Sequence, residues 1–347
     1  MARIRFEKSF QEATLRSPLQ GFREVLERIE VRKDPLTGRR CRINIERARR
    51  PKQASPQTNS ELDALIRESR DGCTFCSRNI EKMTPTFAGG LPARIWVGEA
   101  CVLPNLFPFA GFHAVGVFSS DHYLELDHFT PELIRDCVQA SLRYLNLIQE
   151  GHPEVRYWHI DWNYLPSGGA SIVHPHLQVI AEPEASQSLQ HLLQSSKSYY
   201  DHYGRNYWRD LVETEKDIGE RLIGTSGIVS WLAAFAPQGN REVAAVFSDI
   251  SALAQTGEQE LNDLCRGISR ILKGYHSIGV KSFNMATFSG PSDNDSSDFY
   301  LLNLRMISRP DPAPFYTNDD GFMEKLHHEP IIEAIPEDLT GQLKRFF

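Results

Sequence analysis

The sequence lacks several features that would assign it to a large class of proteins. None of its apolar runs approaches the roughly 20 residues that a membrane-spanning helix needs. Residues 1–13 mix charged with apolar side chains and lack the apolar core of a secretory signal. Positive charge is not in excess, because 38 Lys and Arg face 45 Asp and Glu, for a net charge of −7. We therefore expect a cytoplasmic protein that binds neither membranes nor nucleic acids.

Cysteine is scarce, with six residues in 347. A disulfide framework does not fit a chain of this length without an export signal. Only Cys73 and Cys76 lie close together, and such a Cys-x-x-Cys pair can bind zinc, act in redox chemistry or have no special role. Thioredoxin-like use is disfavoured because no βαβ pattern surrounds the pair. If the pair is half of a zinc site, His122 and His174 are the remaining ligands we prefer.

The sequence does contain an ordinary globular composition, with 41% hydrophobic and 24% charged residues. Its length allows two domains of usual size or one large domain. Residues 32–52 are strongly basic, and the turn sequence Asp34-Pro-Leu-Thr-Gly38 opens this stretch. The arginines can hold phosphates through bidentate contacts, form a solvated surface or act as a nucleic-acid arm. The acidic balance of the whole chain disfavours the last of these.

From about residue 93 the chain repeats one order of elements at an offset of roughly 128 residues. One segment ends in Val-Phe-Ser-Ser at Ser120, and another ends in Val-Phe-Ser-Asp at Asp249. The first is followed by a predicted helix with Thr130 as N-cap, Pro131 in its first turn and Gly151 past its end. The offset predicts duplication of one α+β unit. The other repeated elements are a helix with apolar positions over 261–272, closed by Gly274 or Gly279, and strands over 155–163, 172–181, 281–287 and 299–308.

The segment His174-Pro-His-Leu-Gln178 is the most informative in the chain. In the predicted strand 172–181, the side chains of His174, His176 and Gln178 share one face. Three polar groups on an otherwise apolar strand are costly unless they are paired or used. Pro175 cannot donate to a neighbouring strand, which predicts a sheet edge or a strand start. A neutral imidazole can attack phosphorus and carry a phosphoryl group, and the alternative is a pair of structural histidines.

A possible phosphate-binding loop, from Asn163 to Ser171, directly precedes this segment. Gly168 and Gly169 allow backbone N–H groups to turn toward an anion, and Ser171 adds a hydroxyl. The loop is not a Walker loop, because no Gly-Lys-Ser/Thr follows it. Taken alone it reads as an ordinary hairpin loop, but its position before the two histidines favours a phosphate cradle.

Together these residues resemble galactose-1-phosphate uridylyltransferases, a family of the histidine-triad superfamily. The resemblance covers residues 32–182 with good motifs and the rest more weakly. Separate motifs in the correct order make it specific. The matching segments are Asp34-Pro-Leu-Thr-Gly38 with Arg47-Ala-Arg-Arg-Pro51, Cys73-x-x-Cys76, Asn105-Leu-Phe107, Phe118-Ser-Ser-Asp-His122, and the run from Asn163 to Gln178.

The resemblance implies a role for each matching residue. His176 would be the nucleophile that carries a nucleoside monophosphate, with Gln178 and Ser171 beside it in the catalytic centre. Asn105 and Phe107 would line the nucleoside pocket. The phosphate contacts would come from Arg47, Arg50, Asn163, Gly169, Ser171 and Gln178, and a structural zinc ion would be held by Cys73, Cys76, His122 and His174.

The same resemblance implies an α+β fold of duplicated histidine-triad units, each an antiparallel sheet with helices packed on it. We place the catalytic unit at residues 1–225 and a degenerate unit with the tail at 226–347, in a homodimer. The second half has Leu301-Leu-Asn-Leu-Arg305 in place of the histidine motif, and Phe288 in place of another family histidine. We therefore expect neither a nucleophile nor a second metal site there.

The implied reaction transfers UMP from a nucleotide sugar to a sugar 1-phosphate through a nucleotidyl-histidine. An alternative enzyme would use phosphate or water as acceptor and act on an ADP-sugar or a dinucleoside polyphosphate. A third possibility is a non-catalytic nucleotide-binding or scaffold protein, which would tolerate the loss of His176. The hexose-reading region is poorly matched around residues 321–324, so the sequence leaves the sugar open.

Overall fold

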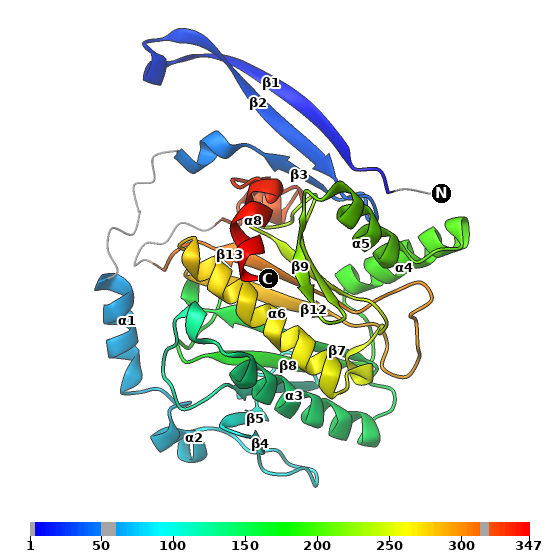
Figure 1. Cartoon of the computed structure of the whole chain (residues 1–347). Coiled ribbons are helices and arrows are strands. Elements are labelled where there is room, and N and C mark those ends of the chain that lie inside the picture. Colours follow the sequence, from blue (N-terminus) through cyan, green and yellow to red (C-terminus); the bar gives the residue numbers. More distant parts are fainter. Residues whose placement is uncertain (1–3, 50–59, 313–318) are drawn as a thin grey trace.

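The structure, a computed structural model, describes residues 4–49, 60–312 and 319–347 (Figure 1). Its helices are α1 Ser60–Arg70, α2 Ser77–Met83, α3 Pro131–Gly151, α4 Gln187–Tyr203, α5 Tyr207–Ile218, α6 Glu258–Ser277, α7 Phe322–Lys325 and α8 Pro336–Leu343. Its strands are β1 Glu7–Ser17, β2 Arg23–Lys33, β3 Arg40–Ile43, β4 Ile95–Val97, β5 Ala100–Pro104, β6 Phe112–Val117, β7 Tyr157–Tyr164, β8 His176–Glu182, β9 Leu222–Ser226, β10 Val229–Ala233, β11 Val243–Phe247, β12 Ser282–Phe288, β13 Asn303–Arg309 and β14 Ile331–Ile332. The predicted α+β class is confirmed.

Ten strands form one sheet in the order β4-β5-β6-β8-β7-β12-β13-β11-β10-β9. The same pattern runs inward from either edge, since β4-β5-β6-β8-β7 matches β9-β10-β11-β13-β12. Helix α3 lies between β6 and β7, and α6 lies between the equivalent strands β11 and β12. The halves meet where β7 pairs with β12, with Asn163 opposite Asn284. This topology confirms the predicted duplication.

The strand register identifies which residues of the two halves are equivalent. In the first half Val117 lies opposite His176, and in the second half Val246 lies opposite Asn303. Both valines begin the Val-Phe-Ser sequences that marked the repeat. The structural counterpart of His176 is therefore Asn303, as the sequence offset predicts.

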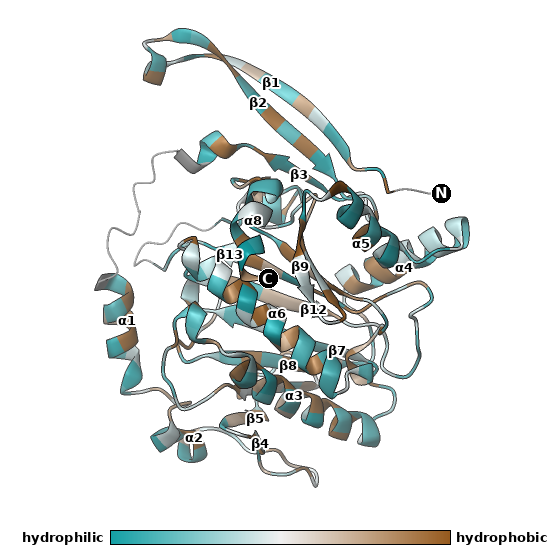
Figure 2. Cartoon of the chain, viewed as in Figure 1, coloured by the Kyte–Doolittle hydropathy of each residue, from teal (hydrophilic) through white to brown (hydrophobic). Residues whose placement is uncertain are grey.

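One face of the ten-stranded sheet is covered by α3 and α6, which also pack against each other (Figure 1). Thr130 caps α3 as predicted, because its side chain accepts a hydrogen bond from the backbone N–H of Leu133 at 3.2 Å. Apolar and polar residues alternate along both helices, so that each has an apolar side for the sheet (Figure 2). Leu177 and Val179 of β8 belong to this core. His176 and Gln178 therefore point to the opposite face.

A smaller sheet of order β1-β2-β3-β14 carries a long ribbon that extends from the body (Figure 1). All residues of β1 but the last are exposed. The root of the ribbon is fastened by Arg32, whose guanidinium donates to the Glu337 carboxylate of α8 at 3.0 and 2.9 Å. Arg221 donates to the same carboxylate at 2.9 Å. A two-stranded ribbon is marginal in water, so this ion cluster holds it to the second half of the molecule.

Two strands begin later than the sequence pattern predicts. β8 begins at His176 rather than Ile172, because Pro175 has no N–H to donate to a neighbouring strand. β13 begins at the equivalent residue, Asn303, rather than at Phe299. Pro175 thus marks a strand start, as predicted, while β8 itself lies inside the sheet.

The helix of the second half, α6, ends at Ser277, so that Gly279, one of the two glycines predicted to close it, follows its end. The division into units 1–225 and 226–347 stays a prediction, since both halves share one sheet. Within the described ranges, no helix is both long enough and apolar enough to cross a membrane.

Candidate functional site

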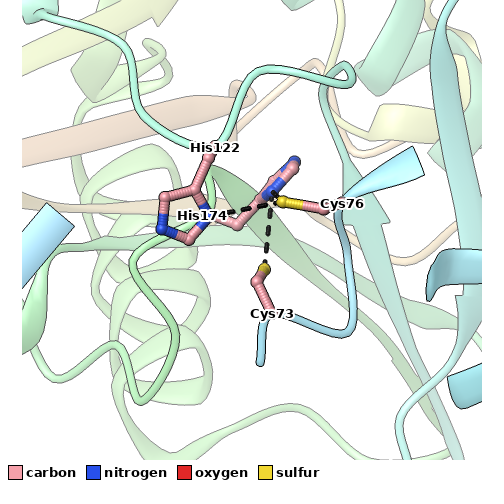
Figure 3. A group of neighbouring side chains, drawn as sticks. All are labelled: Cys73, Cys76, His122 and His174. Atoms are coloured by element: carbon pink, nitrogen blue, oxygen red, sulfur yellow. Dashed lines mark hydrogen bonds between the residues drawn. The ribbon is translucent and has the colours of Figure 1, made fainter. Parts of the chain in front are cut away.

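Four side chains able to bind a metal converge beside the start of β8 (Figure 3). Cys73 and Cys76 lie between α1 and α2, His122 follows β6, and His174 precedes β8. Their ligand atoms all lie within 4.8 Å of one another. Cys76 Sγ is 3.5 Å from His122 Nδ1 and 3.7 Å from His174 Nδ1. Cys73 Sγ is also 3.7 Å from His174 Nδ1. The structure thus brings together the four predicted metal ligands.

The distances and the ring orientations fit a tetrahedral ion. Bonds of about 2.3 Å to sulfur and about 2.0 Å to nitrogen place the ligand atoms of a tetrahedral zinc site about 3.6 Å apart. His174 Nε2 donates to the backbone oxygen of Ser119 at 2.9 Å, and His122 Nε2 donates to Ser69 Oγ at 3.0 Å. The Ser69 hydroxyl in turn donates to the backbone oxygen of Leu65 at 2.7 Å. Each imidazole therefore presents an unprotonated Nδ1 to the cluster.

The charge states of these groups also suit a divalent cation. Burial lowers the pKa of His174 to about 4 and lowers the pKa of His122, so both rings are neutral at pH 7. Burial and the neighbouring Cys73 raise the pKa of Cys76 to about 11. A bound cation would reverse this effect, because it stabilises the thiolate. Two sulfur and two imidazole ligands form a donor set that zinc prefers.

His176, the first residue of β8, has one ring nitrogen free. Its Nδ1 lies 2.8 Å from the backbone oxygen of His174, and since a carbonyl can only accept, Nδ1 carries the proton. Burial lowers the pKa of His176, so the ring is neutral at pH 7. Its Nε2 then holds a lone pair, and no described residue forms a hydrogen bond with that atom. A neutral imidazole nitrogen in this state is a nucleophile.

The side chain of Phe75 packs against both the metal cluster and His176. Phe75, between the two cysteines, lies edge-on to both histidine rings, with centroids 6.1 Å from His174 and 5.4 Å from His176. The Cys-x-x-Cys loop therefore confines the ring of His176 as well as supplying two ligands. A metal ion held there would restrict both the loop and the backbone carbonyl that orients His176.

Two glycines and Asn163 shape the loop before β8, for which the sequence predicts a phosphate cradle. Gly169 has φ of 90°, a left-handed conformation that favours glycine. A Cβ on Gly168 would lie 2.8 Å from the backbone oxygen of Phe283, so no side chain fits there. Asn163 Oδ1 accepts from Asn284 Nδ2 at 2.7 Å, which leaves the Asn163 amide nitrogen available. Ser171 is exposed, and its hydroxyl has no hydrogen-bond partner among the described residues.

The loop after β5 exposes apolar side chains close to β8. Asn105 orders it, since Asn105 Oδ1 accepts from the backbone N–H of Phe107 at 2.9 Å. Leu106, Phe107 and Phe109 are 61%, 83% and 74% exposed. Exposed aromatic rings of this kind offer a surface on which a nucleobase can stack.

Gln178 contacts a histidine that the sequence analysis missed. His113 Nε2 lies 2.5 Å from Gln178 Oε1, and Asn105 Nδ2 lies 3.3 Å from the same oxygen. His113 is a single histidine in the apolar strand β6, so no local pattern marks it. It lies diagonally across from Gln178, because its own cross-strand partner is Ile180. Only the register of β6 and β8 could have revealed the contact.

A second missed group stands on the other side of Gln178, on β7. Asp161 pairs with Gln178 in the strand register and accepts from the backbone N–H of Thr287 at 3.0 Å. Burial raises the pKa of Asp161 to about 6. His159 lies on the same face and has a buried Nε2 without a hydrogen-bond partner in the described part of the chain. In the predicted strand 155–163, His159 and Asp161 share a face with Asn163, and this alternation is the sequence signal that could have identified both residues.

No hydrogen bond or ion pair within the described residues joins Arg47 to the other predicted site residues. Arg47 lies in the short helix Ile45–Arg49, and its Nε is buried without a hydrogen-bond partner among the described residues. Arg50 lies outside the described residues. The predicted turn before them is present, because the Asp34 carboxylate accepts from the backbone N–H groups of Leu36 and Thr37 at 3.1 and 2.7 Å.

Comparison with solved structures defines the class of fold. An ADP-glucose phosphorylase from Arabidopsis thaliana, solved with bound ADP-glucose, superposes with a TM-score of 0.71 at 20% identity, over 91% of this chain and 98% of that one. A uridylyltransferase structure gives a TM-score of 0.67 at 18% identity, over 91% of this chain and 97% of that one. The chain therefore has the duplicated histidine-triad fold of the galactose-1-phosphate uridylyltransferase type. The predicted resemblance is confirmed at the level of the fold.

Sequence comparison identifies two relatives. An uncharacterised protein of Archaeoglobus fulgidus is 27% identical over 320 residues, which is 92% of each chain. An ADP-glucose phosphorylase of Arabidopsis thaliana is 27% identical over 201 residues, or 51% of this chain and 55% of the relative. No known protein-family profile matches the chain.

Proposed function

We propose that this chain is a nucleotidyl-transferring enzyme in which His176 carries a nucleoside monophosphate. The observation that carries the proposal is the state of His176, which is neutral, oriented by the His174 carbonyl and free at Nε2. In the first step Nε2 attacks the α-phosphorus of a nucleotide sugar and forms a P–N bond. The P–O bond to the sugar phosphate breaks, and a sugar 1-phosphate leaves.

The surrounding residues have distinct roles in this proposal. The amides of Gln178 and Asn163, the hydroxyl of Ser171 and the backbone of Gly169 stabilise charge on the phosphoryl oxygens. Arg47 and Arg50 contact phosphates. Asn105 orders the loop whose exposed Phe107 meets the nucleobase. Zinc held by Cys73, Cys76, His122 and His174 has a structural role, since four protein ligands leave no open position.

Two acceptors are compatible with the second step. If a sugar 1-phosphate attacks the nucleotidyl-histidine, the enzyme moves UMP between sugars. If inorganic phosphate attacks, a nucleoside diphosphate is released and the enzyme is a phosphorylase. The likeness to an ADP-glucose phosphorylase over half of the chain favours AMP and phosphate for this second candidate. Both share the first step at His176.

Labelling of the protein tests the shared step and separates the candidates. Wild-type protein is incubated with UDP-glucose or ADP-glucose labelled at the α-phosphorus and quenched in base. We expect an acid-labile label on the wild type and none on His176→Ala. The labelled protein is then offered glucose 1-phosphate, galactose 1-phosphate, phosphate or water, and the discharged product identifies the acceptor. Absence of label from both nucleotide sugars and from a dinucleoside polyphosphate would favour the scaffold alternative.

The remaining expectations are part of the same proposal. The substrates are a nucleotide sugar and a sugar phosphate, the location is cytoplasmic and the assembly is a homodimer. The ribbon β1–β2 presents apolar side chains to solvent, with Leu19 95% and Phe22 68% exposed. Such groups are typical of surfaces that bind another protein. The mass of the protein in solution tests the dimer directly.

A further inference from the structure

We infer that His113 is a positioning residue that holds the side-chain amide of Gln178 in the orientation required for phosphoryl transfer. The inference rests on the proposed function and adds a residue to it. His113 belongs to β6 and is 5% exposed, so water has little access to its ring nitrogens. Its ring lies between Gln178 and the loop that carries the exposed phenylalanines.

The hydrogen bonds fix the protonation of this ring. The backbone N–H of Phe109 donates to His113 Nδ1 at 3.3 Å, so Nδ1 is an acceptor and the proton lies on Nε2. His113 Nε2 then donates to Gln178 Oε1 at 2.5 Å. Asn105 Nδ2 lies 3.1 Å from His113 Nε2, but both are donors in this state. The Asn105 amide therefore donates to Gln178 Oε1, which lies 3.3 Å away.

These two donors determine which way the Gln178 amide faces. They occupy both lone pairs of Oε1, so the amide cannot rotate without losing two hydrogen bonds. The Nε2 group of Gln178 has no hydrogen-bond partner among the described residues, and Gln178 is only partly buried. It follows the nucleophile by two positions on the same face of β8. Its N–H groups are therefore left free for a phosphoryl oxygen.

The second half of the molecule has the same strand pairing at this place, but the two side chains that meet there are charged. Glu242 is the counterpart of His113. It directly precedes Val243, which lies opposite Met306, just as His113 directly precedes Ala114, which lies opposite Val179. The backbone N–H of Gln238 donates to Glu242 at 2.5 Å, just as that of Phe109 donates to His113. There the partner, Arg305, forms an ion pair at 3.0 Å. In the first half, His113 instead donates to the uncharged amide of Gln178 and leaves the N–H groups of that amide free.

The test compares His113→Phe, which removes both ring nitrogens but keeps a ring, with His113→Gln, which keeps a donor and an acceptor. We expect His113→Phe to slow formation of the nucleotidyl-enzyme about 10- to 100-fold, with KM for the nucleotide sugar changed less than about threefold. His113→Gln restores the rate to within about fivefold of wild type. Metal content and melting temperature show that each variant is folded.

A double-mutant cycle with Gln178→Ala distinguishes positioning from general packing. Added to Gln178→Ala, the His113→Phe change has no further effect if His113 acts only through Gln178. Multiplicative losses, a change confined to KM, or a wild-type rate in His113→Phe would overturn the inference. Failure of the wild type itself to form an adduct would instead refute the proposed function, so the two failures are distinguishable.

Discussion

The two halves of the ten-stranded sheet have the same strand order and register but carry different side chains at equivalent positions. In β8 the open face carries His176 and Gln178, and in β13 the equivalent places carry Asn303 and Arg305. Backbone geometry is thus the same where the chemistry differs. The fold alone does not make a site, since function depends on the side chains placed on it.

In the second half, Asn303 and Arg305 each bind another group of the protein, although Asn303 Oδ1 and Arg305 Nε are buried without a hydrogen-bond partner among the described residues. Asn303 Nδ2 donates to Tyr300 Oη and to the backbone oxygen of Leu301, both at 3.0 Å. Arg305 is tied to the buried carboxylate of Glu242. In the first half, by contrast, the Nε2 atoms of His176 and Gln178 have no partner in the described part of the chain. Free donors and a free lone pair on a buried face are what a ligand requires.

The largest expected effect comes from removing the metal cluster, which within the described residues is present in the first half alone. Cys73→Ala should bind less than about a tenth of the zinc found in wild type, because three ligands hold the ion weakly. Formation of the nucleotidyl-enzyme should fall by about 100-fold, since the His174 carbonyl no longer fixes His176. Metal analysis and the labelling assay measure the two effects.

The matched control is Cys101→Ala, which removes another buried thiol in β5 outside the cluster. It should retain the metal and most of the activity. Equal metal content in Cys73→Ala and wild type would show that the four residues are not a metal site.

An ion cluster, rather than a metal, fastens the second half to the ribbon, and its removal should have the next largest effect. Burial acts to raise the pKa of Glu337, but hydrogen bonds and charge from Arg32 and Arg221 lower it to about 2. Glu337→Gln removes the carboxylate that Arg32 and Arg221 share, which leaves Arg32 paired with Glu30 and Arg221 with Glu215 and Glu220. The loss should cost about 2–4 kcal/mol at pH 7. Denaturant unfolding measures this difference in the free energy of unfolding.

The contribution of Glu337 to the free energy of unfolding should depend on pH. A carboxyl whose pKa is lowered by folding contributes stability above its ordinary value of 4.5, and this contribution is lost as the pH falls toward 2. The gap between wild type and Glu337→Gln should therefore narrow at pH 3. Glu329→Gln, which breaks more exposed pairs with Arg40 and Arg42, should cost less than about 1 kcal/mol. Equal costs for the two variants would contradict the assigned role.

The sequence predicts those parts of the site that depend on spacing within one segment. The Cys-x-x-Cys pair, the Pro175 strand start and the capped helix α3 follow from local rules, and the repeat offset correctly pairs His176 with Asn303. The His113–Gln178 contact depends instead on a diagonal across two strands that are far apart in the chain. The Glu337 cluster likewise joins Arg32 of β2, Arg221 just before β9 and Glu337 of α8, which no local pattern connects.

The smallest expected effect concerns Asp161, which stands beside Gln178 where the second half has Ala286. Because burial raises its pKa from 3.8 to about 6, ionising Asp161 in the folded protein is unfavourable. This cost is absent below pH 3.8 and complete once the pH exceeds about 6. Asp161→Asn keeps an acceptor for the Thr287 N–H and should stabilise the protein by about 1–3 kcal/mol at pH 8.

Unfolding at several pH values decides whether Asp161 is a partly buried acid without a compensating charge. The gain from Asp161→Asn should disappear near pH 4, while Asp71→Asn, at an exposed position, should change stability by no more than a few tenths of a kcal/mol at any pH. A loss of stability at pH 8 would mean that the carboxylate is held by charges the structure does not place beside it. A gain accompanied by slower nucleotidyl transfer would show that the first half keeps this acid for its chemistry, which Ala286 in the second half cannot supply.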